Sequence, residues 1–195
     1  MAVSAIRVYL SHDCLALSSG TRYNETDTSN AFAHITNTAY QDLDPNFNEE
    51  DCVRVWNEDD VAPILVRDKT CDSLTEAHER VQHVIHQMEK ITAEVFRAYK
   101  NEFGVFAPIE GCFEHYGLDF VVDKNWQVFL LEINPGPDFK QTGERLSPII
   151  ENLMGDTADV ALLNKQKADR SCGRLALVYE SQARGQAQGI NIKLT

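Results

Sequence analysis

Three polar residues in the second half of the chain have the types and the spacing of a metal site. Asp119 lies in the apolar run YGLDFVV, and Glu132 and Asn134 lie in the later run VFLLEIN, directly before Pro135. A buried carboxylate without a partner costs several kcal/mol, so these carboxylates need either a partner or an exposed position. Carboxylate and amide oxygens are hard ligands of the type that Mg²⁺ binds. The sequence therefore predicts a candidate metal site at Asp119, Glu132 and Asn134.

Two predicted strands, residues 117–123 and 126–134, must position these side chains. A two-residue turn at Lys124-Asn125 would pair Asp119 with Leu130 and place Asp119 diagonal to Glu132, at about 7 Å between backbones. Alternation along the strands then places the apolar residues Val121, Val128 and Leu130 on the face of the carboxylates. The residues expected on the opposite, core face are Leu118, Phe120, Val122, Phe129, Leu131 and Ile133.

Two other interpretations of the carboxylates stay open. Asp119 and Glu132 could be exposed residues on the solvent side of a two-faced sheet, without any bound ion. A three-residue turn would place the two carboxylates on opposite faces and would exclude a shared ion. The hypothesis of a metal site therefore depends on the register of this hairpin.

A long amphipathic helix is predicted upstream of the hairpin. Ser73 and Glu76 have the spacing of a capping box, and apolar residues recur after them at steps of three and four as far as Tyr99. His83 and His86, three residues apart, could in principle share a metal. No third ligand stands near them in the sequence, so exposed helix histidines are the better interpretation.

The remaining segments complete an α+β pattern. Residues 7–10 and 15–18 are predicted strands joined by a turn, and the acidic residues 42–60 are predicted to form a solvated loop or mobile flap. A second helix is predicted from Ser147, with Pro148 at its first position and Gly155 as a possible break. Residues 175–179 and 190–194 could add strands.

Composition limits the classes of partner. The formal net charge is −12, which disfavours binding to nucleic acid through phosphate neutralisation. No apolar run approaches the length of a membrane helix, so no membrane partner is expected. The chain has an odd number of widely spaced cysteines, 5 in all, which is typical of reduced thiols in a cytoplasmic protein.

Two motifs together carry a resemblance. The hairpin YGLDFVVDKNWQVFLLEINPGPDFKQTG resembles the metal-binding end of an ATP-grasp ligase, and AFAHITNTAYQ, residues 31–41, resembles the His-x-Thr-Asn segment of the tubulin–tyrosine ligase family. The resemblance implies an antiparallel sheet with packed helices, a partial ATP-grasp fold. It implies that residues 1–164 are the C-terminal part of such a domain and that residues 165–195 are a basic tail.

The resemblance also implies roles for individual residues. Asp119, Glu132 and Asn134 would bind Mg²⁺, and His34, Thr36 and Asn37 would line an ATP site. For Asn37 a role as a turn residue that bonds local backbone stays open. Lys140 is a tentative catalytic residue that could contact phosphate or the acceptor, and a plain surface lysine is the alternative. With Gln141 it follows the hairpin directly.

The family's chemistry implies an ATP- and Mg²⁺-dependent ligase. A protein carboxylate, on tubulin or another protein, would be phosphorylated to an acyl phosphate, which the amine of a free amino acid would attack to give an amide. The metal would neutralise charge on the transferred phosphoryl group, so no protein nucleophile is required. A cytoplasmic and cytoskeleton-associated location is the matching expectation.

The chain departs from the family pattern at several positions. Leu17 stands where many members have an arginine, and Thr38-Ala39 stand where polyglutamylating members have Tyr-Ser. The lysines that hold the ATP phosphates lie upstream in the family, so we expect this chain to be the C-terminal portion of such a ligase. Two alternatives therefore remain: a catalytically inactive ATP-grasp-like binding or scaffold domain, and an ATP-grasp carboxylate–amine ligase for a small metabolite.

Overall fold

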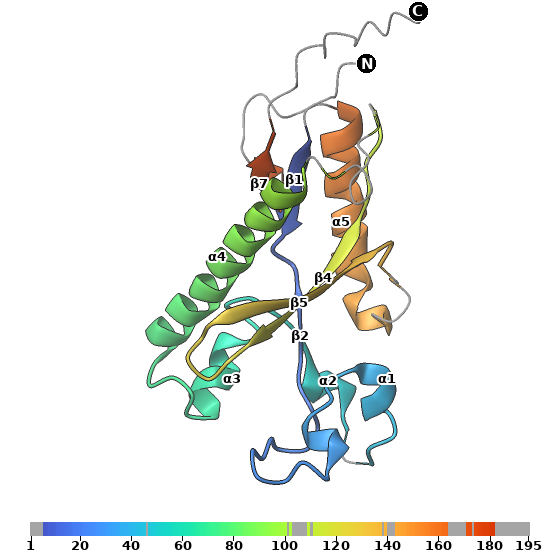
Figure 1. Cartoon of the computed structure of the whole chain (residues 1–195). Coiled ribbons are helices and arrows are strands. Elements are labelled where there is room, and N and C mark those ends of the chain that lie inside the picture. Colours follow the sequence, from blue (N-terminus) through green and yellow to red (C-terminus); the bar gives the residue numbers. More distant parts are fainter. Residues whose placement is uncertain are drawn as a thin grey trace, which may run out of the picture. The chain divides into compact units, whose positions relative to one another are not determined.

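A computed structural model describes residues 6–45, 47–100, 102, 109, 111–137, 139, 143–163, 171–172 and 174–181, with the side chains of residues 143–146, 163 and 171–172 left aside (Figure 1). The chain divides into two units. One is the continuous segment His12–Gln82, and the other combines Met1–Ser11 with His83–Thr195.

The longest element is helix α4, Leu74–Tyr99; its predicted start is confirmed, and most of its predicted core face is buried, although Leu74 and Tyr99 at its two ends are exposed. Ser73 Oγ accepts a hydrogen bond from the amide of Glu76 at 3.2 Å. The Glu76 carboxylate accepts from the amide of Asp72 at 2.9 Å, one residue before the position that a standard capping box uses. The buried apolar residues of α4 are Ala77, Val81, Val84, Ile85, Met88, Ala93 and Phe96.

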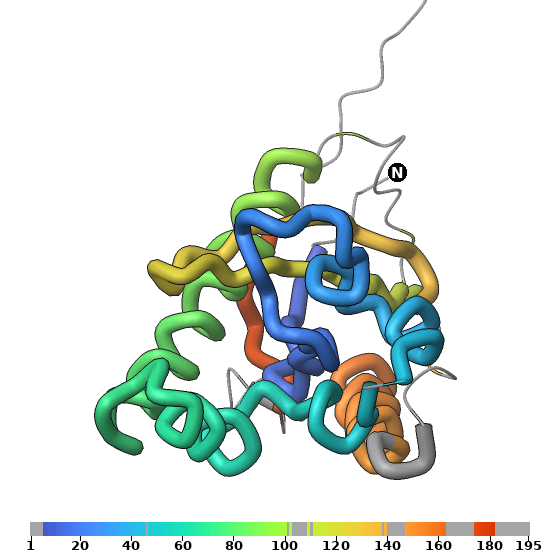
Figure 2. Tube along the Cα trace, turned by 90° about the horizontal axis from the view of Figure 1, so that it is seen from below, coloured from blue at the N-terminus to red at the C-terminus, as the bar shows by residue number. Residues whose placement is uncertain are grey.

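The unit His12–Gln82 has a small antiparallel sheet and several short helices, and Figure 2 traces its backbone in the colours from blue to green. Strand β2, Leu15–Leu17, pairs with β3, Val53–Val55. The helical elements are η1 (Ala31–Ala33), α1 (Thr38–Gln41), α2 (Glu49–Cys52) and α3 (Ala62–Arg67), followed by the start of α4. Helix α2 runs directly into β3 and thereby orders the chain on either side of Cys52.

The prediction of a solvated loop or mobile flap over residues 42–60 is wrong in its secondary structure, although Asp42, Glu49, Glu50, Asp51 and Asp59 are exposed as predicted. This segment contains α2 and β3, and Asp44 is only 5% exposed. Arg54 lies 3.1 Å from Asp60 and 3.3 Å from Asp51, and Asp60 also accepts from the backbone amide of Val55 at 2.8 Å. Arg54 and the amide of Val55 therefore compensate the charge of Asp60, while most other acidic residues of the segment are exposed.

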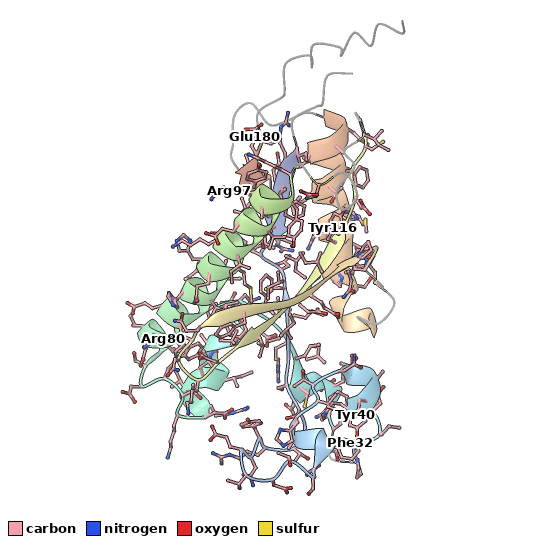
Figure 3. The ribbon with its side chains drawn as sticks, in the orientation of Figure 1. Phe32, Tyr40, Arg80, Arg97, Tyr116 and Glu180 are labelled. Atoms are coloured by element: carbon pink, nitrogen blue, oxygen red, sulfur yellow. The ribbon has the colours of Figure 1, made fainter. Side chains whose placement is uncertain are left out.

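The second unit has a three-stranded antiparallel sheet in the order β1-β7-β6. Its strands are β1 (Arg7–Ser11), β6 (Ser171–Cys172) and β7 (Leu175–Glu180), and Figure 3 labels Glu180, whose carboxylate pairs with Arg7 at 3.0 Å. The strands at 7–10 and 175–179 are thus confirmed, but β1 pairs with β7 and not with β2. Residues 190–194 lie outside the described residues. The boundary at residues 164 and 165 stays a prediction, although part of the predicted tail forms β7.

The same unit contains the hairpin of β4, Tyr116–Val122, with β5, Val128–Pro135, and the helix α5, Gly143–Leu163. Helix α5 begins one turn before Ser147, so Pro148 lies inside it, and the helix continues through Gly155. Small antiparallel sheets and packed helices confirm the predicted α+β class. Among the described helices, none combines the length and the apolar character that a membrane span requires.

Candidate functional site

The hairpin turn differs from the two-residue turn that the sequence predicts. The amide of Asp123 donates to the carbonyl of Gln127 at 2.9 Å, and the amide of Trp126 donates to the carbonyl of Asp123 at 3.0 Å. Trp126 has a φ of 64°, which a turn of this type requires at that position. The backbone amides of Gln127 and Asn125, which bond the Asp123 carboxylate, lower the pKa of that group. The turn therefore spans three residues, Lys124 to Trp126.

A β-bulge at Leu131 cancels the effect of this turn on the two carboxylates. The ladder pairs Phe120 with Leu130 and Asp119 with Glu132, so Leu131 has no residue opposite it. A three-residue turn alone would place Asp119 and Glu132 on opposite faces. With the bulge they are direct cross-strand partners on one face, which is closer than the diagonal arrangement that the sequence predicts.

The changed register also exchanges which apolar residues are exposed. Phe129 and Leu131 were predicted in the core but are 54% and 65% exposed, and Val121 is 45% exposed beside them. Val128, predicted on the carboxylate face, is buried instead. These assignments are wrong because alternation was counted from a two-residue turn. The face that carries Asp119 and Glu132 therefore has an apolar patch, defined by Val121, Phe129 and Leu131.

Gln87 of α4 fixes the tip of the hairpin. Its Nε2 donates to the carbonyl of Trp126 at 2.7 Å, and its Oε1 accepts from the amide of Val128 at 3.2 Å. The side-chain amide thus acts as a short strand partner for β5 at the point where the turn ends. Sequence reasoning missed Gln87, because it lies at the polar edge of the helical stripe beside Met88 and belongs to no motif.

The two carboxylates share a hydrogen-bonded contact. Burial raises the pKa of Asp119, and the hydrogen bond and the negative charge of Glu132 raise it further. Asn134, also exposed, donates from Nδ2 to Glu132 Oε1 at 3.1 Å. A shared proton or a cation between the oxygens would stabilise such a pair. In the described part of the chain, no three residues of the His, Cys, Asp or Glu types form a cluster suited to a metal.

The candidate nucleotide residues lie in the other unit. His34 Nε2 lies 2.7 Å from the carbonyl oxygen of Asp27, and the His34 ring meets the ring of Tyr23 edge-on at 5.2 Å. Thr36 is exposed. Asn37 Oδ1 accepts from the amide of Ala39 at 3.0 Å and caps α1. The backbone role that the sequence left open for Asn37 is therefore present. Its role toward ATP stays a prediction.

The two candidate residues that follow the hairpin, Lys140 and Gln141, lie outside the residues that the structure describes.

His83 and His86 are exposed on α4, and His86 Nδ1 lies 3.2 Å from Glu89 Oε2. Among Cys14, Cys52, Cys71 and Cys112 all four thiols are free.

Both candidate groups fall in a segment that matches a known family. A model of the tubulin-tyrosine ligase family matches residues 1–170. The chain belongs to the tubulin–tyrosine ligase family. That family belongs to the ATP-grasp superfamily, and the hairpin and packed helices of this chain are consistent with part of such a domain. Strand β7 lies beyond the matched residues.

Curated relatives agree with this family. A probable tubulin–tyrosine ligase from Schizosaccharomyces pombe is 34% identical over 84% of the chain, and one from Saccharomyces cerevisiae is 34% identical over 75%. A probable tubulin polyglutamylase from Bos taurus is 24% identical over 82%. The chain spans 36%, 18% and 32% of the lengths of these three relatives. No solved structure matches the chain.

Proposed function

We propose that this member of the tubulin–tyrosine ligase family takes part in ATP- and Mg²⁺-dependent formation of an amide between an amino acid and a protein carboxylate. The observation that carries the proposal is the direct pairing of Asp119 with Glu132, with Asn134 beside them on an exposed face. Membership in the family supports a protein-modifying ligase in general. The cofactors and the steps of the reaction are our proposal.

The oxygen atoms of this hairpin fit a hard divalent cation. Two carboxylates in hydrogen-bonding contact repel each other when both are ionised, and a cation would relieve that repulsion in place of a proton. Mg²⁺ keeps several waters and is commonly held by one or two carboxylates together with substrate phosphates. A set of two carboxylates and one amide is therefore sufficient. Bound Mg²⁺ would neutralise charge on the phosphates of ATP.

The apolar patch of the hairpin supports a nucleotide as the partner of that cation. Val121, Phe129 and Leu131 lie on the face that carries the carboxylates. A purine base needs an apolar surface on which to pack, whereas its phosphates need the cation. In the other unit we propose that His34, Thr36 and Asn37 contact ATP. Asn37 would do so from its position at the N-terminus of α1.

The proposed reaction has two transfers. The terminal phosphoryl group of ATP passes to a protein carboxylate and leaves ADP. The amine of an amino acid then attacks the acyl phosphate and releases phosphate, which gives the amide. The task of the chain is to position the reactants and to stabilise charge, which needs no nucleophile of its own. Lys140 remains a candidate contact of the acceptor or the phosphate.

The names of the relatives suggest the class of acceptor. They include probable tubulin–tyrosine ligases, a probable tubulin polyglutamylase and a tubulin glycylase from Tetrahymena thermophila. We propose that the acceptor here is also a carboxylate of tubulin or of another protein, and that the reaction takes place in the cytoplasm. Because this chain covers about a third or less of these relatives, turnover is proposed for the family protein as a whole.

Binding of Mg·ATP to the 195-residue chain tests the proposal by isothermal titration calorimetry. Asp119→Asn and Glu132→Gln should each weaken binding by about tenfold or more, because one charged ligand is lost. Glu94→Gln on the exposed side of α4 is the matched control and should bind like the parent. Equal affinity in all four proteins would contradict the site assignment.

A binding domain without turnover is the second candidate function. Leu17 at the end of β2 is 44% exposed, and no cationic side chain stands at that position. The two candidates differ in one measurement, the release of phosphate from Mg·ATP in the presence of an amino acid and a peptide with an acidic C-terminus. Binding without phosphate release would favour the domain that only binds.

A further inference from the structure

A fully buried glutamine connects three backbone segments in the unit His12–Gln82. Gln41, the last residue of α1, is 0% exposed. Its Nε2 donates to the carbonyl of Phe32 at 2.9 Å and also to the carbonyl of Ile35. Its Oε1 accepts from the amide of Gly20 at 2.9 Å. One side chain therefore ties the turn after β2 to the segment on both sides of His34.

The hydrogen bonds specify an amide at position 41. The two carbonyls need a group with two N–H donors, and the Gly20 amide needs an acceptor on the same side chain. A carboxylate would satisfy Gly20 but would meet two carbonyl oxygens without a donor. An apolar side chain would leave three backbone groups, in partly buried hydrogen bonds, without this partner.

Neighbouring contacts reinforce this arrangement. Asp44, also buried, accepts from the hydroxyl of Thr21 at 3.0 Å, and its own amide donates to the carbonyl of Gln41 at 2.8 Å. The rings of Phe32 and Tyr40 lie 5.3 Å apart, and Figure 3 shows both in the small helices of this unit. The turn at Gly20 and Thr21 is thus held at two successive residues by Gln41 and Asp44.

The segment that Gln41 holds is short, and its other side-chain contacts lie at its two ends, where His34 contacts Asp27 and Tyr23 and Asn37 caps α1. The amides of His34 and Ile35 both bond the carbonyl of Ala31, at 3.1 and 3.0 Å. After Ile35 come Thr36 and Asn37, which are exposed and precede α1. The bond from Gln41 to the Ile35 carbonyl is consequently the last side-chain contact before Thr36. A change at position 41 would alter where the His34–Asn37 segment lies.

We propose that Gln41 is a positioning residue for the His34–Asn37 segment, and that its amide holds this segment in the conformation that binds a nucleotide. This inference rests on the proposed function, since that function makes the segment a nucleotide contact. Gln41 itself is buried and touches no ligand. Its effect is therefore expected on affinity for the nucleotide and on the local order of residues 34–37.

The test compares Gln41→Met with Thr92→Val in the full chain. Methionine has nearly the length of glutamine but makes none of the three bonds. Thr92 is also buried, and its hydroxyl donates to the Met88 carbonyl at 2.7 Å within α4, so its valine variant is a matched loss of a buried hydrogen bond. Gln41→Met should raise the dissociation constant of Mg·ATP by about tenfold, and Thr92→Val by less than about twofold.

Hydrogen exchange distinguishes a local effect of Gln41→Met from a general loss of stability. In Gln41→Met, the amides of Gly20 and Ile35 should exchange faster than in the parent, while amides in the middle of α4 keep their protection. A matching rise throughout the chain, or unchanged affinity for Mg·ATP, would overturn the proposal. If Gln41→Met does not fold, Thr21→Val removes the adjacent bond to Asp44. Thr21→Val should then weaken Mg·ATP binding, and parent-like affinity would overturn the proposal.

The two proposals fail in different ways. If the parent binds Mg·ATP and Asp119→Asn does not, while Gln41→Met binds like the parent, only the inference about Gln41 is wrong. If the parent itself does not bind Mg·ATP, the proposed function is wrong and the inference about Gln41 falls with it.

Discussion

Leu131 shows how one residue determines which side chains share a face. Because Leu131 has no partner in the ladder, Glu132 lies opposite Asp119 in spite of the three-residue turn. A bulge of this kind adds one residue to one strand and leaves the pairing on both sides intact. The adjacent Leu130 is paired and faces the core side of the hairpin.

Deletion of one of the two leucines, Leu130 or Leu131, tests this interpretation. Either deletion gives the same sequence, in which a single leucine pairs with Phe120 and Glu132 still follows opposite Asp119. We expect the pairing of the carboxylates to survive and the affinity for Mg²⁺ to stay within about threefold of the parent. Cross-strand nuclear Overhauser contacts between residues 119 and 132 check the pairing, and their loss would contradict the assigned register.

Cys14 gives a prediction for alkaline pH. Burial raises the pKa of its thiol to about 11, the bond of the thiolate to its own backbone amide opposes this, and the charge of Asp13 adds to it. The native state therefore keeps the thiol protonated above pH 9.0, where the unfolded state ionises. The stability that this protonated thiol contributes is present below pH 9.0 and falls as the pH rises toward 11.

Labelling at pH 8 with a thiol reagent, followed by peptide mapping, measures the reactivity of each thiol. Cys112 is exposed and should react within minutes, while Cys14, which is only partly exposed and has a raised pKa, should react more slowly. In Cys14→Ala, the free energy of unfolding should fall less steeply between pH 9 and pH 11. Equal labelling rates for Cys14 and Cys112 in the native protein would contradict the raised pKa of Cys14.

At the scale of elements, α4 is the part on which sequence and structure agree best. Its cap and its buried stripe are both local signals, so the residue types at its start and the periodicity of its apolar residues identify them.

Ser73→Ala should lower the free energy of unfolding by about 1 kcal/mol through loss of the cap. Val84→Ala should lower it by about 2 kcal/mol because Val84 is fully buried, whereas Leu74→Ala at the exposed start of the helix should have little effect. Urea denaturation measures all three, and an equal loss in the Val84 and Leu74 variants would contradict the assigned core face.

The hairpin and the acidic segment show why other elements could not be predicted fully. Both strands of the hairpin follow from alternation, but its register depends on the positive φ of Trp126 and on Gln87, which is 39 residues away in the sequence. In residues 42–60, Asp44 is bonded by Thr21, a distant residue, and Asp60 by Arg54 within the segment. Charge density correctly indicates that most of the acidic side chains are exposed, but it gives no signal for these specific partners or for α2 and β3.

The candidate site, too, could be predicted only in part from the sequence. The types of Asp119, Glu132 and Asn134 and their place on a hairpin were predictable from the sequence. Their direct contact was not, because it needs the bulge as well as the turn. Gln41 and Gln87 were not identified at all, since buried amides that bond backbone leave no periodic signal.

At the scale of the whole molecule, strand β7 decides whether residues 165–195 are a tail. A chain ending at residue 163 would lose β6 and β7, and β1 would lose its only partner strand among the described residues. We expect the melting temperature of that chain to fall by about 10 °C or more. A chain ending at residue 181 keeps β7 and is the control.

Circular dichroism during heating measures both truncated chains. If the chain ending at residue 163 melts like the control, β7 adds no stability and the division at residues 164 and 165 is supported. If it melts lower, as we expect, residues 175–180 belong to the folded domain.

The pairing of β1 with β7 also has a consequence for the order of events during synthesis. Arg7 and Glu180 are 173 positions apart, so β1 must wait during synthesis for the intervening residues before its partner strand β7 is made. Contacts of such high sequence separation form late and slowly. The continuous segment His12–Gln82 has no such delay and can fold while translation continues. During that interval Val8, which is buried in the finished sheet, lacks the partner strand that pairs with β1 in the folded chain.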